Sequence, residues 1–417
     1  MSVRYLRWLS ALRWAPYRRV WSVWMLQQSG YWFSSIAFQW LVARATDSDA
    51  LTLSVLYFCL LLPMLLVSLP AGVLADTHDR RRIVLVAQSA ILLVSTTTAT
   101  LVLLGLAPVP VLMACAFAVG TAHSLAQPST QALVANAVPV DDLGSAVVLQ
   151  SIAMNLARIG GPALAGVLIL YRGAVESLAA YGVIGLVALV IMRFVRPVAT
   201  RPPAAPRQRL AARIGSGLRH ARSRPPAWTA LAIVAVTATF AIAYVAQLPT
   251  VAGLVSDDPG LFLVLTSVTG VGSLVGVLVV ALRPSSGPSV TPPAALLAAL
   301  GAVVVGLGVN RLLWLEYLLV AVGGALQFAI MTQCNSVIQQ VVDDDHRGRV
   351  MSLYTMCWGG LLPVGGLVLG VSWHFLGPLV ALACNGVIAL AFAGWVLRPG
   401  AARTRAAAAQ PALIETA

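Results

Sequence analysis

The chain has 417 residues; 59% are hydrophobic, only 10% are charged, and the mean hydropathy is +0.87. Soluble domains carry about 25% charged residues, so this composition excludes an ordinary soluble protein. The formal net charge is +13, but the arginines are spread between hydrophobic segments and form no patch, which excludes a nucleic-acid-binding surface.

Twelve apolar segments are long enough to cross a membrane, since a spanning helix needs about 20 apolar residues. We therefore predict an all-α membrane protein. The predicted spans are 20–43, 50–75, 83–106, 109–137, 143–170, 174–195, 227–252, 260–282, 292–310, 312–339, 350–371 and 375–397.

The arginines fix the predicted orientation. With the N-terminus inside, the cytoplasmic segments hold 23 arginines, counting Arg193 at the inner end of the sixth span, and the external loops hold three; Arg158 lies deep within a span. Cytoplasmic loops of membrane proteins are enriched in basic residues. Both termini are therefore predicted to be cytoplasmic, in a multi-pass protein of the cytoplasmic (inner) membrane.

The longest polar stretch divides the spans six and six. Within it, RLAARIGSGLRHARSRPP favours a short basic helix on the inner membrane surface, ending before Pro225. The predicted organisation is an N-terminal arm (1–19), a six-helix bundle (20–195), a basic linker (196–226), a second six-helix bundle (227–397) and a cytoplasmic tail (398–417).

The two halves are related in sequence. When Gly120 is placed on Gly324 without gaps, GTAHSLAQPSTQALVANAVPVDDLG aligns with GALQFAIMTQCNSVIQQVVDDDHRG. The fourth and tenth spans then occupy equivalent places. This indicates parallel repeats related about an axis along the membrane normal.

A polar turn follows the second span, where residues 72–82 read GVLADTHDRRR. A carboxylate ends one helix and three arginines precede the next, which is typical of a cytoplasmic hairpin. It resembles the hairpin after the second helix of the major facilitator superfamily of transporters.

Three further runs resemble the enterobactin-exporter and macrolide-efflux branch of that superfamily: QPSTQALV at 127–134, NLARIGGPALAG at 155–166 and NSVIQQVVDDDHRGRVMSLY at 335–354. The resemblance implies two six-helix bundles around a central cavity. It also implies export of amphipathic small molecules driven by the proton gradient, and we expect a monomer. Thr77 and Asp79 depart from the usual hairpin pattern, and the first span lacks the acid found in some drug antiporters.

The resemblance implies a gate at the cytoplasmic side, in which Asp76 faces the start of the eleventh span while that side is closed. A carboxylate at a helix N-terminus is favourable by about 0.3–1 kcal/mol, and by up to about 2 kcal/mol when partly buried. The alternative is a solvated acid that caps Arg80 or Arg81. The candidate gating residues are Gly72, Asp76, Arg80, Arg81, Arg347, Gly348 and Arg349.

Two ionisable residues lie deep in predicted spans. Arg158 is about 22 Å along its helix at 1.5 Å per residue, where a charge costs at least about 2.5–3.5 kcal/mol. It either binds an anionic cargo group or ties the bundle together through oxygens such as those of Asn155. His123 lies at similar depth and either carries protons or packs between helices.

Amides and aromatic side chains on the first, fourth, seventh, tenth and eleventh spans form a candidate cargo pathway. They either hydrogen-bond the cargo or join helices, at about 0.6 kcal/mol for each bond. The amides are Gln27, Gln28, Gln39, Gln127, Gln247, Gln327, Gln333 and Asn335; the adaptable wall is Trp24, Trp32, Met356 and Trp358.

The fifth span carries Gly160, Gly161, Pro162 and Gly166, which resemble the antiporter signature. These residues favour either close helix packing or a hinge. Glu316 and Glu176 fall near span ends, so we expect them at the membrane interface; the alternative for Glu316 is a role in proton transport. The five cysteines lie singly in apolar runs, without the spacing of a disulfide or metal site.

The sequence therefore predicts a secondary exporter of hydrophobic or amphipathic small molecules, such as drugs, siderophores or natural products, working by proton antiport. The alternatives are an importer, a lipid transporter, or a membrane receptor or assembly factor. No Walker loop, zinc spacing or nucleophile elbow occurs. We expect no enzyme activity, cofactor, metal or nucleic-acid partner; the partners expected are a small-molecule substrate, protons and membrane lipids.

Overall fold

The computed structural model describes residues 7–195, 210–282 and 287–398. Within these ranges every regular element is a helix. The chain divides into two compact units: residues 1–48 with 55–205, and residues 49–54 with 206–417.

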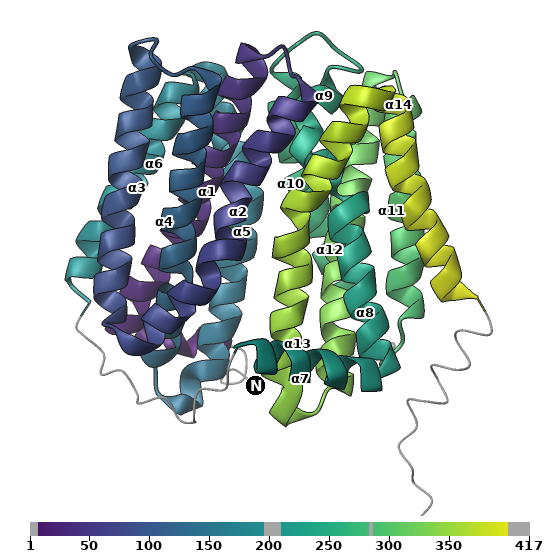
Figure 1. Ribbon diagram of the computed structural model, residues 1–417. Helices are drawn as coiled ribbons and strands as arrows, with labels where there is room; N and C mark the ends of the chain where they lie inside the picture. The colour runs from purple at the N-terminus through teal and green to yellow at the C-terminus, as the bar shows by residue number, and fades with distance from the viewer. Residues whose placement is uncertain (1–6, 196–209, 283–286, 399–417) are drawn as a thin grey trace, which may run out of the picture. The chain divides into compact units, whose positions relative to one another are not determined.

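The first unit is built on a long first helix. That helix, α1, packs against α4, α5 and α6, and α3 packs against α4 and α6 (Figure 1). The elements are η1 (Arg7–Arg13), α1 (Ala15–Ala45), α2 (Ala50–Thr77), α3 (Arg80–Leu103), α4 (Val109–Asn136), η2 (Val140–Asp142), α5 (Leu143–Tyr171) and α6 (Ala174–Arg193). The first five residues of α2 belong to the second unit.

The second unit contains two π-helical segments, η3 and η5. Its helix α10 packs against α12, α11 packs against α12 and α14, and α7 packs against α13 and α8. The elements are α7 (Leu210–Ser223), α8 (Pro225–Val236), η3 (Thr237–Ala241), η4 (Ala243–Gln247), α9 (Leu248–Ala252), α10 (Leu261–Ala281), α11 (Thr291–Val309), α12 (Leu313–Val341), α13 (Asp344–Thr355), η5 (Met356–Gly360) and α14 (Leu361–Leu397).

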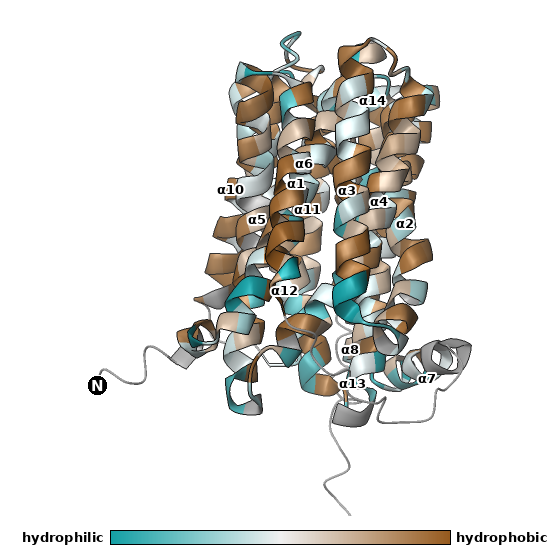
Figure 2. Cartoon of the chain, turned by 90° about the vertical axis from the view of Figure 1, so that its left-hand side faces the viewer, coloured by the Kyte–Doolittle hydropathy of each residue, from teal (hydrophilic) through white to brown (hydrophobic). Residues whose placement is uncertain are grey.

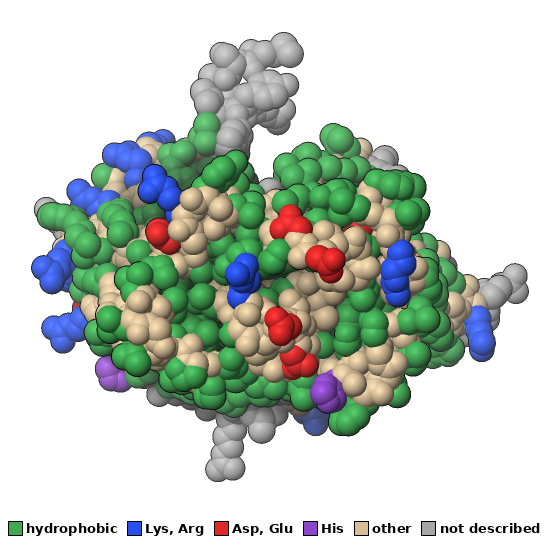
Figure 3. Space-filling model, turned by 90° about the horizontal axis from the view of Figure 1, so that it is seen from above, with side chains coloured by type: hydrophobic (Ala, Val, Ile, Leu, Met, Phe, Trp, Pro, Cys, Tyr) green, Lys and Arg blue, Asp and Glu red, His purple; other side chains and the backbone are tan. Residues whose placement is uncertain are grey.

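The described helices have the hydrophobic surfaces expected of helices in a membrane. Hydrophobic residues cover most of the helix lengths (Figure 2), whereas the face seen from above, at the ends of the helices, carries acidic and basic side chains among the hydrophobic ones (Figure 3). Large apolar side chains such as Leu93, Val86 and Phe375 are exposed. In lipid such exposure is favourable, and helices satisfy their own backbone hydrogen bonds. The prediction of an all-α membrane protein is confirmed.

By length and composition, nine helical segments of the described residues can cross a membrane. The longest, His346–Leu397, contains two predicted spans, and α5 contributes only two shorter apolar stretches, Leu143–Met154 and Gly160–Tyr171. The twelve predicted segments fall largely on helices. The count of twelve fits this arrangement and stays a prediction.

Three helix boundaries differ from the ends of the predicted spans. Helix α1 begins at Ala15, five residues before the predicted span, because Pro16 is tolerated in a first helical turn. The predicted span 227–252 is interrupted after Val236 by π and 3₁₀ segments. There Thr237 Oγ1 donates to the carbonyl of Ile233 at 2.7 Å, a bond that bends helices.

The third difference concerns the break between the last two predicted spans, 350–371 and 375–397. Helix α14 runs without interruption through residues 372–374, and the break lies at Gly377, with φ 80° and ψ 166°. Glycine adopts positive φ at little cost, and the following Pro378 cannot supply a helical N–H.

Close packing of α10 on α12 depends on glycines. A Cβ on Gly272 would meet the carbonyl oxygen of Ala321, and a Cβ on Gly276 would meet that of Ala325. The two glycines lie four residues apart and therefore on one helix face. Small residues at this spacing let membrane helices approach closely.

We predict that Gly272→Ala and Gly276→Ala lower the thermal unfolding temperature in detergent, because overpacking costs about 1–3 kcal/mol. The matched control is Gly394→Ala on α14, where an added Cβ meets no atom within 4 Å. Equal melting temperatures for all three variants would contradict this account of the helix contact.

The segment before α1 is anchored to the start of α5 by Asp142. Ser10 Oγ donates to Oδ1 at 2.6 Å, while Arg13 Nη2 and Trp14 Nε1 each donate to Oδ2 at 2.7 Å. The Asp142 side chain is only 6% exposed. The hydrogen bonds from Ser10, Trp14 and Arg13 lower the pKa of Asp142 to about 2.

We predict that Asp142→Asn lowers the melting temperature and speeds protease cleavage at Arg13, whereas Asp141→Asn, at an exposed neighbour, changes neither. Because the folded-state pKa lies below the ordinary 3.8, ionised Asp142 stabilises the fold above that pH. The difference between wild type and Asp142→Asn should therefore shrink as pH falls from about 4 to about 2. A difference that is constant over this range would contradict the anchor.

Candidate functional site

An aromatic and imidazole cluster lies in the first unit. The His123 ring on α4 lies 4.4 Å from the Tyr31 ring on α1, at 31°, and Tyr31 meets Trp32 edge-on at 6.2 Å. The His123 Nδ1 atom is buried and has no hydrogen-bond partner among the described residues. The cluster thus offers a polar atom that water or a bound molecule could satisfy.

Three predicted amides accompany this cluster. Gln27 and Gln28 on α1 are buried, and Gln127 on α4 is half-buried. The Gln27 Nε2 donor has no hydrogen-bond partner within the part of the chain that the structure describes. Among the predicted pathway residues of this unit, Gln27, His123 and Trp24, through its indole Nε1, therefore keep an unsatisfied buried atom.

The glycine motif of α5 packs against α1. A Cβ on Gly161 would lie 2.8 Å from Trp32 Cβ, and α5 continues as one helix across Pro162. Gly166 is also buried. Close packing accounts for Gly161, and a hinge at this motif stays a prediction. Asn155 and Arg158 lie on α5, but their side chains are outside the described residues.

The predicted amides of the second unit differ in their hydrogen bonds. Gln327 is buried on α12, and its Oε1 has no partner among the described residues. Asn335 accepts a hydrogen bond from Gln339. Gln247 Nε2 donates to the carbonyl of Ala50 at 2.8 Å, within the same unit.

Two more predicted pathway residues are used in packing or internal bonds. Gln39 Nε2 donates to Ser35 Oγ at 3.5 Å, and Trp24 is buried in the core of the first unit. Several of the amides predicted to bind cargo therefore have hydrogen-bond partners within the protein. Gln27 and Gln327 remain open to a bound molecule, whereas Gln39, Gln247 and Asn335 bond within the protein.

The π-helical segments position Trp358. This residue lies in η5 and meets Phe328 of α12 edge-on, with ring centroids 6.4 Å apart. The other π segment, η3, passes close to α14, since a Cβ on Gly365 would meet the carbonyl oxygen of Thr239. π-Helical turns are rare and occur frequently at functional sites. Neither turn was predicted from the sequence.

The arginines of the hairpin between α2 and α3 bind helix ends. Arg80 Nε donates to the Ala75 carbonyl at 2.8 Å. Arg81 reaches the end of α6, where it donates to the carbonyls of Met192 at 3.2 Å and Arg193 at 2.8 Å. Cations suit the carbonyl end of a helix.

The remaining predicted gating residues differ in their surroundings. A Cβ on Gly72 or Gly348 would meet no atom within 4 Å, and Arg347 is exposed. Arg349 Nη1 bonds Ser216 Oγ on α7 at 3.1 Å. The Asp76 side chain lies outside the described residues, so its predicted gating contact stays a prediction.

Helix α7 confirms the predicted basic helix before Pro225 and packs on α13. The rings of His220 and His346 stack at 4.2 Å and 5°, and Arg224 Nη2 bonds both carboxylate oxygens of Asp343, at 3.0 and 3.1 Å. Burial, followed by the His346 charge, lowers the pKa of His220, while Asp343 opposes the shift. Sequence reasoning missed this contact, because its residues lie far apart along the chain.

Glu316 lies in the first turn of α12, at the span end expected from the sequence, and its side chain is fully buried within the protein. Asn310 Nδ2 donates to its Oε2 at 2.7 Å. The other oxygen, Oε1, has no partner among the described residues, and neither does the buried hydroxyl of Tyr244. Burial follows because Asn310 precedes α12 and turns back onto its first turn.

Residues 7–412 match the model of a family described as transmembrane secretion effectors. The chain belongs to this family. It is also 24% identical over 362 residues to the staphyloferrin A transporter of Staphylococcus aureus (strain NCTC 8325 / PS 47), covering 86% of this chain and 89% of that protein.

Solved transporters share the fold. A bacterial homologue of the human lysosomal transporter Spinster, inward-facing and unoccupied, has a TM-score of 0.67 at 13% identity, with 95% of this chain and 97% of that chain covered. A peptide transporter (POT) has a TM-score of 0.71 at 15% identity, covering 93% and 95%. The protein is thus a multi-pass transporter of the major facilitator superfamily and not an enzyme.

Proposed function

We propose that this protein exports a small molecule of the siderophore type across the cytoplasmic membrane in exchange for protons. The observation that carries the proposal is the match of residues 7–412 to the transmembrane secretion effectors. The resemblance to a staphyloferrin A transporter supports a siderophore as the cargo. The arginine distribution supports cytoplasmic termini, and hence a cytoplasmic entry side.

Cargo binding is assigned to the buried polar atoms that lack protein partners. Gln27 Nε2, His123 Nδ1 and Gln327 Oε1 belong to this class among the described residues. A buried polar atom without a hydrogen bond costs about 1–3 kcal/mol. Polar groups of the cargo remove that cost when they bind, and nearby rings such as Tyr31 and Trp358 supply apolar contacts.

Recognition of anionic cargo is assigned to Arg158, because an arginine deep in a span is tolerated only beside a partner. Alternating access then moves the cargo across the membrane. We propose that Asp76 biases this cycle toward the state closed to the cytoplasm. It would act together with Arg80, Arg81 and the start of α13.

We predict that everted membrane vesicles with an acidic interior accumulate staphyloferrin A or a related siderophore only when they contain this protein. The accumulation should stop when a protonophore collapses the gradient. In Arg158→Gln, transport of anionic siderophores should fall at least about tenfold while a neutral compound is spared. Arg158→Lys, which keeps the charge, should retain part of the transport.

A broad panel that shows no protein-dependent movement in these vesicles would contradict export by proton antiport. Uptake in the opposite direction would identify an importer. Loss of folded protein in both Arg158 variants would assign that arginine to the stability of the bundle instead of the cargo.

The coupling proton is assigned to Glu316. Its carboxyl group is fully buried, and one hydrogen bond from Asn310 is all that the described residues supply to it. An isolated buried carboxylate is costly, so burial couples its charge to protonation. The buried Tyr244 hydroxyl likewise has no hydrogen-bond partner among the described residues.

We predict that Glu316→Gln abolishes gradient-driven export but leaves downhill exchange of cargo, because the amide keeps the shape and cannot release a proton. Glu176→Gln, at an exposed residue in the first turn of α6, should leave both activities unchanged. Proton-coupled export at the wild-type rate in Glu316→Gln would overturn this assignment. If His123→Gln alone lost the coupling, the proton would belong to His123.

A further inference from the structure

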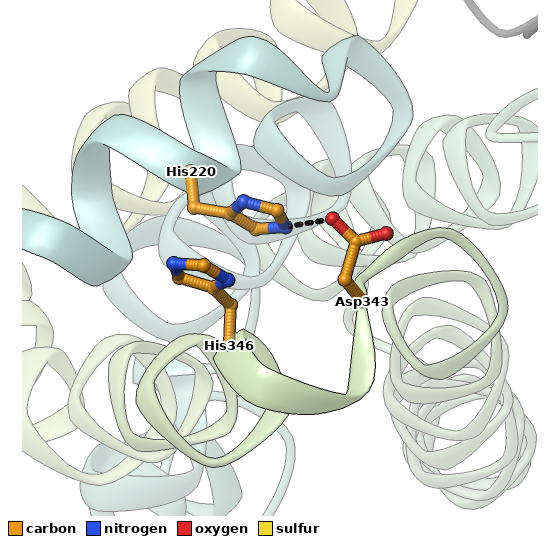
Figure 4. Close-up of side chains that lie close together, drawn as sticks. All are labelled: His220, Asp343 and His346. Atoms are coloured by element: carbon orange, nitrogen blue, oxygen red, sulfur yellow. Dashed lines mark ion pairs between the residues drawn. The ribbon is translucent and has the colours of Figure 1, made fainter.

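Three potential metal ligands meet where α7 packs on the junction of α12 and α13. His220 projects from α7, while Asp343 and His346 project from the junction (Figure 4). One ligand atom from each of the three lies within 4.8 Å of the others. His220 Nε2 lies 3.5 Å from Asp343 Oδ2, and the two imidazole rings are stacked 4.2 Å apart.

The His220 ring nitrogen lacks a hydrogen bond of its own. Its Nε2 atom is buried without a hydrogen-bond partner among the described residues, and the side chain is only 11% exposed. Asp343, in contrast, is 55% exposed, so solvent and ions can reach the cluster from that side. A buried nitrogen lone pair beside an accessible carboxylate is suited to a cation that enters from solution.

The donor set selects one class of cation. Two imidazole nitrogens and one carboxylate oxygen are ligands of zinc, iron(II) and other first-row transition ions. Magnesium and calcium prefer oxygen ligands throughout. Three protein ligands leave coordination positions for water, which is typical of an exchangeable ion.

The neighbouring arginine is compatible with a bound cation. Arg224 contacts both oxygens of Asp343, at 3.0 and 3.1 Å. Coordination through Oδ2 would leave Oδ1 with the guanidinium. Arg224 then orients the carboxylate, as hydrogen-bonded groups around metal sites do.

We propose that His220, Asp343 and His346 form a binding site for a transition-metal dication that fastens α7 to the start of α13. Without metal, the contacts in this region include the ring stack, the His220–Asp343 and Arg224–Asp343 pairs and the bond from Arg349 to Ser216. Coordination adds a link between three side chains on two elements. Metal availability would thereby control how firmly the linker helix is held, whatever cargo the transporter moves.

The test is a calorimetric Zn²⁺ titration of the full-length protein in detergent, after removal of any polyhistidine tag. One ion should bind per chain and raise the melting temperature, because an ion that binds only the folded state stabilises it. His220→Gln and His346→Gln should each weaken binding at least about 100-fold, and Asp343→Asn should weaken it at least about tenfold. Mg²⁺ should produce neither heat nor stabilisation.

The matched controls are His78→Gln, at an exposed histidine after α2, and His374→Gln, at a histidine 3.9 Å from Asp49. Both should bind Zn²⁺ like wild type. Unchanged binding in the His220→Gln, His346→Gln double variant would overturn the proposal, as would loss of binding in His374→Gln alone. Melting curves without metal establish that each variant is folded.

Discussion

The structure depends on one constraint: a polar group inside a membrane has no water and must find a partner in the protein, in a bound molecule or in an enclosed solvent site. Helices meet this requirement for their own backbone. Side chains meet it through short local bonds, such as Thr237 to the Ile233 carbonyl and Asn310 to Glu316. The polar atoms that remain unsatisfied are therefore informative. His123 Nδ1, Gln27 Nε2, Gln327 Oε1 and Glu316 Oε1 are of this kind, and their burial connects the fold to transport.

In the two sequence repeats, the short segment before the first helix is held by different side-chain contacts. In the first unit the short segment η1 precedes α1 and packs on α5. In the second unit the basic helix α7 precedes α8 and packs on α13. In the first unit Asp142 holds that segment through bonds from Ser10, Arg13 and Trp14. The alignment that pairs Gly120 with Gly324 pairs Asp142 with His346. The alignment thus places an imidazole, stacked on His220, where the first repeat has the charged Asp142.

Sequence reasoning reached the architecture because hydrophobic length and arginine placement are local signals. It located the helices to within a few residues, and it missed the interruption at Thr237 and the shift of the last break to Gly377 because both depend on backbone detail. For the candidate site it named His123, Gln27 and Gln327, but it could not separate them from Gln39, Gln247 and Asn335, whose partners are set by packing. The burial of Glu316 was also beyond its reach, since it requires Asn310 to turn back from the loop before α12. The contact of His220 with Asp343 joins residues more than a hundred positions apart, and no spacing rule reveals it.

A structure of the protein with its siderophore cargo bound tests most directly the claim that unsatisfied buried atoms form the binding site. The account predicts that polar groups of the cargo lie within hydrogen-bonding distance of His123 Nδ1 or Gln27 Nε2, and that Gln39 and Gln247 keep their protein partners. A cargo bound away from His123 and Gln27, with those two side chains paired instead to other protein groups, would contradict it.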